Sequence, residues 1–372
     1  DCVVTATNGL GGTSADSNDI ENIAGIAPSI SGVPTISSQT EVGETITATP
    51  ASVTGSPTPT TSWQWERSSN GATGWADIIG ATSSTYTLVP TDDTKYVRAV
   101  QTETNVLGSD SANSASSGQV SFYDADAAAY FAAASITDPT EKDAVNQLVL
   151  DLKGTGSTTN NNNIWDSMNA IYPVSPTSLA AAAFNLKNPS AFEITWYNSP
   201  THATTGITGG TTKYGDTGYD ANSEGMSNND FGITYSGVYL GGDYAMGVLS
   251  AGAYFAIRNA SSKKIFYAGG SSTSALGVDT TRSVTTGIRS SNISREIYKN
   301  GVSNGTNTTS DTKTLPALTI YVLALDNAGS PAGYFAGEAD FWAVHTALTG
   351  GEVVDLYDAI STYNANVISG GR

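Results

Sequence analysis

The C-terminal segment 334–364 combines a strand pattern with a helix pattern, and this combination constrains the fold most. Residues 334–344 are rich in bulky, β-favouring side chains, and a pair of glycines then interrupts the strand period. Apolar residues recur after the glycines at helical spacing: Val353, Leu356, Tyr357, Ile360 and Tyr363. Acidic residues occupy the other face or the first turns, where they suit the positive end of a helix: Glu352, Asp355 and Asp358. The segment predicts a β-rich domain that ends in one amphipathic helix.

The composition favours strands and turns over charged helical bundles. Only 13% of the 372 residues are charged and 39 are Gly. A chain of this length can form two or three domains with cores of their own. The formal net charge of −18 excludes nucleic acid as a partner, because phosphates need basic contacts, and it disfavours adsorption to anionic membranes. We interpret the charge as a solubility device for an extracellular particle.

Cys2 is the only cysteine, so an intrachain disulfide and a cysteine-based metal cluster are both excluded. No apolar run approaches transmembrane length. The sequence begins with Asp rather than Met and shows no basic segment followed by an apolar core. We therefore expect a processed, truncated or partial chain.

The pattern along the chain predicts four parts. Residues 1–30, rich in Gly, Ser, Asn and Asp, indicate an N-terminal arm or linker. Residues 31–121 have a strand-and-turn rhythm, residues 122–190 are rich in Ala and Leu and indicate a helical connector, and residues 191–372 return to strands.

The second part has the alternation of a β-sandwich. Trp63 and Trp65 point to one face, and their polar neighbours point to the other. Together with an early strand at 42–48, the segment 79–88 and a corner at 92–96, this pattern resembles the bacterial and phage immunoglobulin-like repeats. The resemblance implies a sandwich that is stabilised by its Trp and Tyr core alone, without the usual disulfide. It implies a fold and leaves function open.

The connector predicts three helices, at residues 124–134, 139–153 and 164–172. The Gly-, Thr- and Asn-rich run 154–163 between the second and the third predicts a flexible loop.

The connector and the fourth part resemble phage virion proteins. The matching residues are Trp165, Met168, Ala170, Ile171, Tyr172 and Pro173, followed by Phe184, Asn185, Leu186, Lys187 and Pro189. In that family such a lead-in precedes a concanavalin-like lectin/glucanase (laminin-G-like) jelly roll. The candidate strands are 193–197, 230–235, 254–258, 264–268, 282–288, 295–299, 318–325 and 334–345, with a two-residue turn at Asn300-Gly301. The resemblances imply a mainly β fold class: an immunoglobulin-like β-sandwich plus a concanavalin-like jelly-roll sandwich, with a short helical connector and a C-terminal helix.

Glucanases on this fold place three acidic residues on one strand as Glu-x-Asp-x-x-Glu. This chain matches the first two with Glu338 and Asp340 but has Ala343 in the third position. A retaining hydrolase without that acid lacks the proton donor to the leaving oxygen. We expect Glu338 and Asp340 to face solvent opposite their apolar neighbours, and we predict no catalytic residue.

His202 and His345, the only histidines, come without a nucleophile elbow and are expected to be structural. Two histidines and one cysteine do not favour a zinc site. Calcium is the alternative left open, since loop carboxylates could supply oxygen ligands. The candidate ligands are Asp216, Asp220, Asp230 and Asp243. They lack EF-hand spacing, and we predict no cofactor.

Tyrosines in the Gly- and Asn-rich loops could stack on sugar rings. The carbohydrate-binding candidates are Tyr214, Tyr219, Tyr235, Tyr239 and Tyr244. The alternative is that Tyr235 and Tyr239 belong to sheet packing.

The family resemblance implies a non-enzymatic bacteriophage virion structural protein: a capsid decoration, a head fibre or a tail adhesin at the virion surface or otherwise extracellular. The arm at 1–30 would bind other virion proteins, and the lectin-like domain would bind host-surface glycans. Repeated copies in a homo-oligomer would give avidity. We expect neither nucleic-acid binding nor membrane insertion. The alternatives are an extracellular glycan hydrolase or a carbohydrate-binding remnant of one, a purely architectural decoration protein, and a secreted bacterial surface adhesin.

Overall fold

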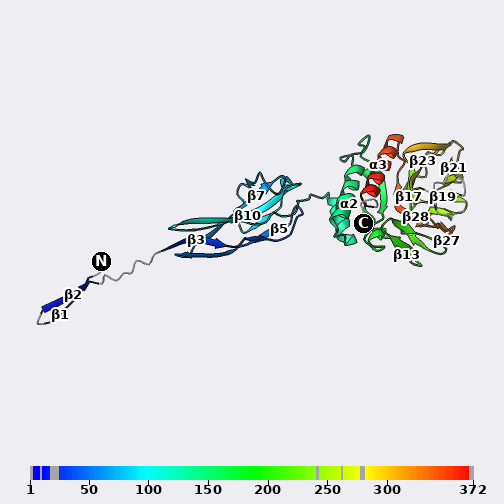
Figure 1. The fold of residues 1–372 in the computed structure, drawn as a ribbon. Coiled ribbons are helices and arrows are strands. Elements are labelled where there is room, and N and C mark those ends of the chain that lie inside the picture. Colours follow the sequence, from blue (N-terminus) through cyan, green and yellow to red (C-terminus); the bar gives the residue numbers. More distant parts are fainter. Residues whose placement is uncertain are drawn as a thin grey trace. The chain divides into compact units, whose positions relative to one another are not determined.

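The computed structural model describes residues 3–8, 11–16, 25–239, 243–260, 263–276 and 281–367. The chain divides into two compact units, Asp1–Phe122 and Tyr123–Arg372 (Figure 1). Antiparallel sheet dominates both units, and the second ends in a long helix. The predicted mainly β fold class with a C-terminal helix is confirmed, whereas the finer four-part division stays a prediction.

The N-terminal unit consists of short antiparallel sheets. Its strands are β1 (Val3–Asn8), β2 (Gly11–Asp16), β3 (Ile26–Ser31), β4 (Thr35–Ile36), β5 (Thr45–Thr49), β6 (Ser52–Ser56), β7 (Thr60–Ser68), β8 (Ala76–Asp77), β9 (Thr85–Thr87), β10 (Tyr96–Asn105) and β11 (Gly108–Asn113). The main sheets have the orders β11-β10-β7-β8 and β4-β5-β9, and β3 pairs with β6. Strands β1 and β2 form a hairpin within the segment that was expected to be an arm. Cys2 lies outside the described residues.

The core of the N-terminal unit is built around Trp65. Its side chain is fully buried and packs with Ile46, Leu88 and Val97, and Trp63 is partly buried against the same cluster. The prediction that both tryptophans of β7 point to one face is confirmed. Burying one large aromatic ring removes enough apolar surface to anchor a small sandwich that has no disulfide.

The C-terminal unit is a sandwich of two larger sheets, which are antiparallel except where β26 pairs with β18 in parallel. The helix-covered sheet has the order β14-β15-β28-β17-β22-β23-β24, with β12 also paired to β28, and the second sheet has the order β13-β16-β25-β18-β19-β20-β21. The strands of the first are β12 (Met168–Pro173), β14 (Thr201–Ala203), β15 (Gly206–Thr208), β17 (Phe231–Val238), β22 (Ser283–Ser291), β23 (Ser294–Lys299), β24 (Val302–Asn307) and β28 (Glu338–His345). Those of the second are β13 (Thr195–Tyr197), β16 (Tyr214–Asp216), β18 (Tyr244–Ser250), β19 (Ala253–Ala260), β20 (Lys263–Gly269), β21 (Ser271–Leu276), β25 (Tyr321–Val322), β26 (Leu325–Asn327) and β27 (Ser330–Ala332).

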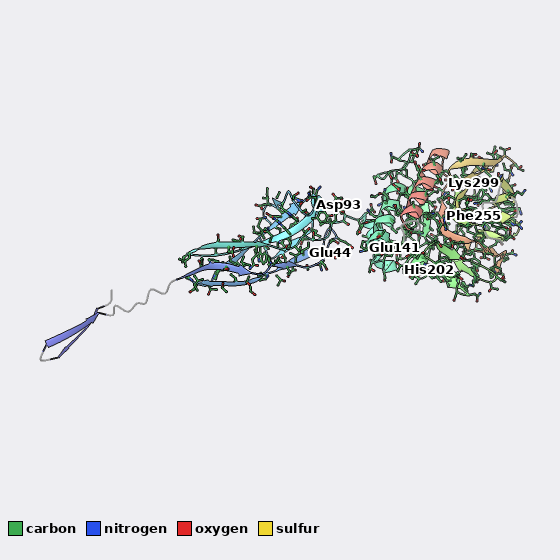
Figure 2. All side chains as sticks on the ribbon, in the orientation of Figure 1. Glu44, Asp93, Glu141, His202, Phe255 and Lys299 are labelled. Atoms are coloured by element: carbon green, nitrogen blue, oxygen red, sulfur yellow. The ribbon has the colours of Figure 1, made fainter. Side chains whose placement is uncertain are left out.

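Two apolar cores hold this unit together. The first lies between the sheets, where Phe231, Phe255 and Trp342 meet (Figure 2 labels Phe255). The second lies between the helix-covered sheet and the helices α1 (Ala125–Ala134), α2 (Pro139–Leu152) and α3 (Gly350–Val367). Figure 1 shows α2 and α3 on one side of the unit, with β19 and β21 on the other. The central strands β17 and β28 of the helix-covered sheet are therefore buried on both faces along nearly their whole length.

The segment 164–172 is not a helix, and that prediction is wrong. It forms one short 3₁₀ turn, Trp165–Ser167, followed by strand β12, which pairs with β28. Ile171 packs under the helices and Tyr172 packs between the sheets, so both sides of this strand are buried. Tertiary pairing has therefore overridden a local pattern that fits either a short helix or a strand.

The structure corrects two expectations near α3: the exposure of Asp355 and the flexibility of the run 154–163. The stripe Val353, Leu356, Ile360 and Tyr363 is buried as predicted, but Asp355 is fully buried too. Its carboxylate accepts the backbone N–H groups of Asn160 and Asn162 at 2.7 and 2.9 Å. The run 154–163, which was expected to be a flexible loop, is thus tied to α3 by hydrogen bonds. A buried carboxylate is tolerated because these donors satisfy it.

Most predicted strands of the C-terminal unit are present with shifted ends. The predicted strand 318–325 divides into β25 and β26, and the one expected from residue 334 begins at Glu338. Asn300 and Gly301 have φ angles of 51° and 75°, as the predicted two-residue turn requires. None of the described helices combines the length and apolar character of a membrane span.

Candidate functional site

The described helices pack on the helix-covered sheet and leave the outer face of the second sheet, which contains β18, β19 and β20, without a helix layer. Alternate residues of β18, β19 and β20 point into the core, including Met246, Phe255 and Phe266. Their neighbours in sequence therefore point outward, since side chains alternate along a strand. The outward positions are rich in tyrosine, and the tyrosines form two groups.

The first tyrosine group consists of Tyr197, Tyr214, Tyr321 and Tyr334. Tyr197 and Tyr214 are register partners on β13 and β16, and their rings stack with centroids 4.6 Å apart and planes 5° from parallel. Tyr321 and Tyr334 pack against Tyr214 at 4.9 and 6.3 Å. Tyr214 and Tyr321 are each 8% exposed, whereas Tyr197 is 41% exposed. The group is a packed aromatic base with one accessible ring on it.

The second tyrosine group consists of Tyr244, Tyr254 and Tyr267. The rings of Tyr254 and Tyr267 stack at 4.9 Å, and Tyr244 lies 6.3 Å from Tyr267. The Arg258 guanidinium lies over the Tyr244 ring at 5.5 Å and forms an ion pair with Asp243. We call the two groups together the tyrosine face.

Two carboxylates flank the first tyrosine group. Asp216 is the register partner of Tyr321, and Asp326 follows on β26 with 1% exposure. Burial, together with the nearby charge of Asp216, raises the pKa of Asp326. Burial, with the charges of Asp326 and Asp216, also raises the pKa of Tyr321, so its hydroxyl stays protonated at neutral pH. The arrangement offers aromatic ring faces, phenolic hydroxyl groups and carboxylate acceptors on one surface.

The predicted sugar-binding tyrosines are not brought together by the fold. Tyr214 belongs to the first tyrosine group and Tyr244 to the second. Tyr219 and Tyr235 are 1% and 0% exposed in the core between the sheets, so neither presents a ring face to solvent. Tyr239 is half-buried against the same core, which fits the sheet-packing alternative for Tyr235 and Tyr239.

The remaining residues of the tyrosine face were missed from the sequence: Tyr197, Tyr254, Tyr267, Tyr321 and Tyr334. Three of them lie in strands where tyrosine alternates with residues of the inter-sheet core, as Tyr254 and Tyr267 do beside Phe255 and Phe266. The signal that could have found them is this alternation, which places the tyrosine opposite the buried phenylalanine.

Asp340 does not face solvent, so the expectation is wrong for this residue, whereas Glu338 is partly exposed. Both carboxylates form ion pairs with Arg282, and Asp340 also accepts a hydrogen bond from Asn364 of α3 at 2.8 Å. Asp340 is 1% exposed. Asp340 is buried because its side chain projects from the face of β28 that the helices cover, where it contacts Asn364 of α3.

The two histidines have structural contacts. His345 is fully buried, with Nε2 3.0 Å from the Thr234 hydroxyl and Nδ1 2.7 Å from the Thr346 carbonyl oxygen. Burial lowers the pKa of His345 to about 4. His202 Nε2 lies 2.8 Å from the carbonyl oxygen of Ser175. The Thr234 hydroxyl is fully buried together with His345 and donates to Thr286 Oγ1 at 3.0 Å.

The aspartates considered as calcium ligands have separate roles. Asp216 and Asp220 accept backbone N–H groups of their own turns, from Gly218 and Asn222. Asp230 accepts from the Ala347 N–H, and Asp243 pairs with Arg258. In the part of the chain that the structure describes, no group of three or more His, Cys, Asp or Glu side chains is placed to hold a metal ion.

Comparison with known protein families gives a match within the N-terminal unit. A family described as "Domain of unknown function (DUF8696)" matches residues 32–120. No curated protein matches the chain.

Among solved structures, one concerns botulinum neurotoxin type C, whose cell entry depends on interaction with two ganglioside molecules. It is 12% identical with a TM-score of 0.40, covering 53% of this chain and 52% of that one. Domain 4 of a GH43 extracellular arabinanase from Geobacillus stearothermophilus, in complex with arabinotriose, is 12% identical with a TM-score of 0.36, covering 51% and 98%. The CBM40 of the Ruminococcus gnavus IT-sialidase, bound to α2,3-sialyllactose, is 13% identical with a TM-score of 0.33, covering 40% and 93%. This chain spans about half the length of the neurotoxin chain, so the proposals below rest on the site itself.

Proposed function

We propose that the C-terminal unit is a non-enzymatic, extracellular carbohydrate-binding module and that its binding surface is the tyrosine face. The observation that carries this proposal is the stacked pair Tyr197 and Tyr214, which holds one accessible aromatic ring in a fixed orientation beside Asp216. Sugar rings have apolar faces and hydroxyl edges, so a fixed ring next to polar acceptors suits them. No reacting group is required at this surface.

The binding step follows from this geometry. A sugar ring would lie on the outer side of Tyr197, while its hydroxyl groups donate to Asp216 and accept from the phenolic O–H groups of the first tyrosine group. The Tyr197 ring loses little conformational freedom on binding, because it already rests on Tyr214. Each contact is weak, so useful affinity would come from several copies acting together.

We propose a non-enzymatic module because Asp340 and Glu338 are not placed to act as a catalytic pair. A retaining hydrolase needs one carboxylate as nucleophile and a second as acid/base, both within reach of the glycosidic bond. Asp340 is buried under α3, and Glu338 is paired with Arg282. The surface with accessible aromatic rings is on the other sheet.

Truncation of Tyr197 to Ala tests the binding proposal. Binding of the purified chain to an oligosaccharide array, followed by calorimetric titration of the best ligand, should show a loss of about tenfold in affinity for the variant. Phe122, which is 51% exposed and belongs to the N-terminal unit, supplies the matched control as Phe122→Ala. Equal binding by both variants and the wild type would contradict the proposed site.

We further infer that this module is presented at the surface of a bacteriophage virion, with the N-terminal unit as its attachment side and other virion proteins as partners. What supports this is the sequence resemblance, the two-unit organisation and the net charge of −18, which suits a soluble exterior. Mass spectrometry of purified particles, with antibody labelling in the electron microscope, tests it. Recovery of the protein only from the bacterial cell surface would favour the adhesin alternative.

A further inference from the structure

The charged side chains that reach the first tyrosine group are carboxylates. Burial and neighbouring tyrosines raise the pKa of Tyr214, and the charged groups that contribute are Asp216 and Asp326. The same two aspartates act on Tyr321. Among the described residues, neither Asp216 nor Asp326 forms an ion pair with a Lys, Arg or His side chain, so no ion pair offsets their negative charge beside this group.

Two basic residues near the tyrosine face, Lys213 and Arg258, contact partners other than Asp216 and Asp326. Lys213 precedes Tyr214 in sequence, and its Nζ donates to the Thr201 hydroxyl at 3.2 Å. Arg258 belongs to the second tyrosine group, where it is paired with Asp243 and lies over Tyr244. Since the whole chain carries a net charge of −18, the background field has the same sign as the local one.

We infer that the first tyrosine group selects uncharged oligosaccharides against glycans that carry carboxylates, such as sialylated or uronic-acid sugars. This inference rests on the proposed function and names its ligand class. A neutral sugar hydroxyl donates a hydrogen bond to Asp216, a charge-assisted contact. A carboxylate on the same sugar ring would be repelled by Asp216, whose charge no ion pair offsets, and this repulsion costs affinity.

Asp216 is the specificity-determining residue in this arrangement. It is half-buried, and its Oδ1 accepts the Gly218 N–H at 2.9 Å. A carboxylate has about four acceptor sites, so this contact leaves capacity for a ligand hydroxyl. Asp216→Asn keeps the Oδ1 acceptor for the turn and removes the charge, which makes it a clean test. Asp77→Asn, at an exposed position of β8 in the N-terminal unit, removes one charge elsewhere and is the matched control.

The experiment measures binding of the wild type, Asp216→Asn and Asp77→Asn to matched sugar pairs: lactose with α2,3-sialyllactose, and galactotriose with trigalacturonate. At low salt the wild type should bind the neutral member of a pair about five- to tenfold more tightly, and added salt should narrow the gap. Asp216→Asn should also reduce the difference in affinity between the neutral and the acidic sugar, and Asp77→Asn should leave that difference unchanged.

Tighter binding of the acidic members by the wild type, with Tyr197→Ala still weakening binding about tenfold, would overturn the selectivity and leave the carbohydrate-binding proposal intact. A neutral preference that Asp216→Asn does not alter would overturn the role of Asp216. Failure of every sugar pair to bind would overturn both the selectivity and the proposed function.

Discussion

The ring of Tyr197 lies nearly parallel to that of Tyr214, with 4.6 Å between the centroids and 5° between the planes. Tyr214 is held in turn by Tyr321 and Tyr334, and it is 8% exposed. The accessible ring is therefore oriented by a buried one. The two residues therefore have different roles in the proposed site. Tyr197 contacts the ligand, and Tyr214 positions the Tyr197 ring.

The two roles give different outcomes on mutation. Tyr214→Ala should weaken sugar binding as much as Tyr197→Ala does, and it should also lower the free energy of unfolding by about 2–4 kcal/mol, because it leaves a cavity under the face. Tyr197→Ala should change that free energy by less than about 1 kcal/mol, since its ring is 41% exposed. Urea unfolding together with sugar titration measures both quantities. If the stability losses of the two variants were equal, the assignment of roles would be wrong.

Asp355 ties the run 154–163 to α3, and its replacement should release that loop. In Asp355→Asn one carboxylate oxygen becomes an NH₂ group, which then faces the N–H of Asn160 or Asn162. A buried donor left without an acceptor costs about 1–3 kcal/mol. Hydrogen exchange should show faster exchange at the amides of Asn160 and Asn162. Asp166→Asn, at an exposed position nearby, should leave both the exchange and the unfolding curve unchanged.

The strand pattern and the last helix could be predicted because they depend on local alternation and periodicity. The buried stripe of α3 and the turn at Asn300-Gly301 are set by such short-range rules. Segment 164–172 could not be predicted, because its state is decided by pairing with β28, more than 160 positions away in register. The burial of Asp355 and Asp340 has the same origin, since helix packing on distant strands decides it.

The candidate site was predicted only in part for a related reason. Tyr214 and Tyr244 were found because they lie beside Gly-rich loops, but that criterion also selected Tyr219 and Tyr235, which are core residues. What distinguishes the groups is the face of the sheet to which each side chain points. That property requires the register between strands, such as Tyr197 opposite Tyr214, and register is a tertiary feature.

His345 makes the C-terminal unit less stable in mild acid. Its pKa is lowered by burial to about 4 from an ordinary value of 6.5, so the unfolded chain binds a proton between these values that the folded chain does not. Stability contributed by neutral His345 is therefore fully present above pH 6.5 and is lost as the pH falls toward 4, by about 3 kcal/mol in total. His345→Gln cannot take up that proton. Urea unfolding at pH 7 and pH 4.5 should show a smaller loss for this variant than for the wild type, and parallel losses would contradict the prediction.

Asp92 organises the corner of the N-terminal unit, and its loss should destabilise this unit. It is fully buried and accepts hydrogen bonds from the Tyr86 hydroxyl at 2.7 Å, the Val89 N–H at 2.9 Å and Arg67 Nη1 at 2.9 Å. Asp92→Ala leaves all three donors without this acceptor, and we expect a loss of about 3 kcal/mol or more in the free energy of unfolding of this unit. Tyr86→Phe removes one of the donors and should cost about 1 kcal/mol.

Calorimetry measures these losses, because the two compact units have separate cores. The unfolding temperature of the N-terminal unit should fall, while that of the C-terminal unit should stay unchanged. A combined Asp92→Ala/Tyr86→Phe variant should be no less stable than Asp92→Ala alone, since the Tyr86 hydroxyl has already lost its acceptor; a fully additive loss would show that the Tyr86–Asp92 hydrogen bond does not hold this corner.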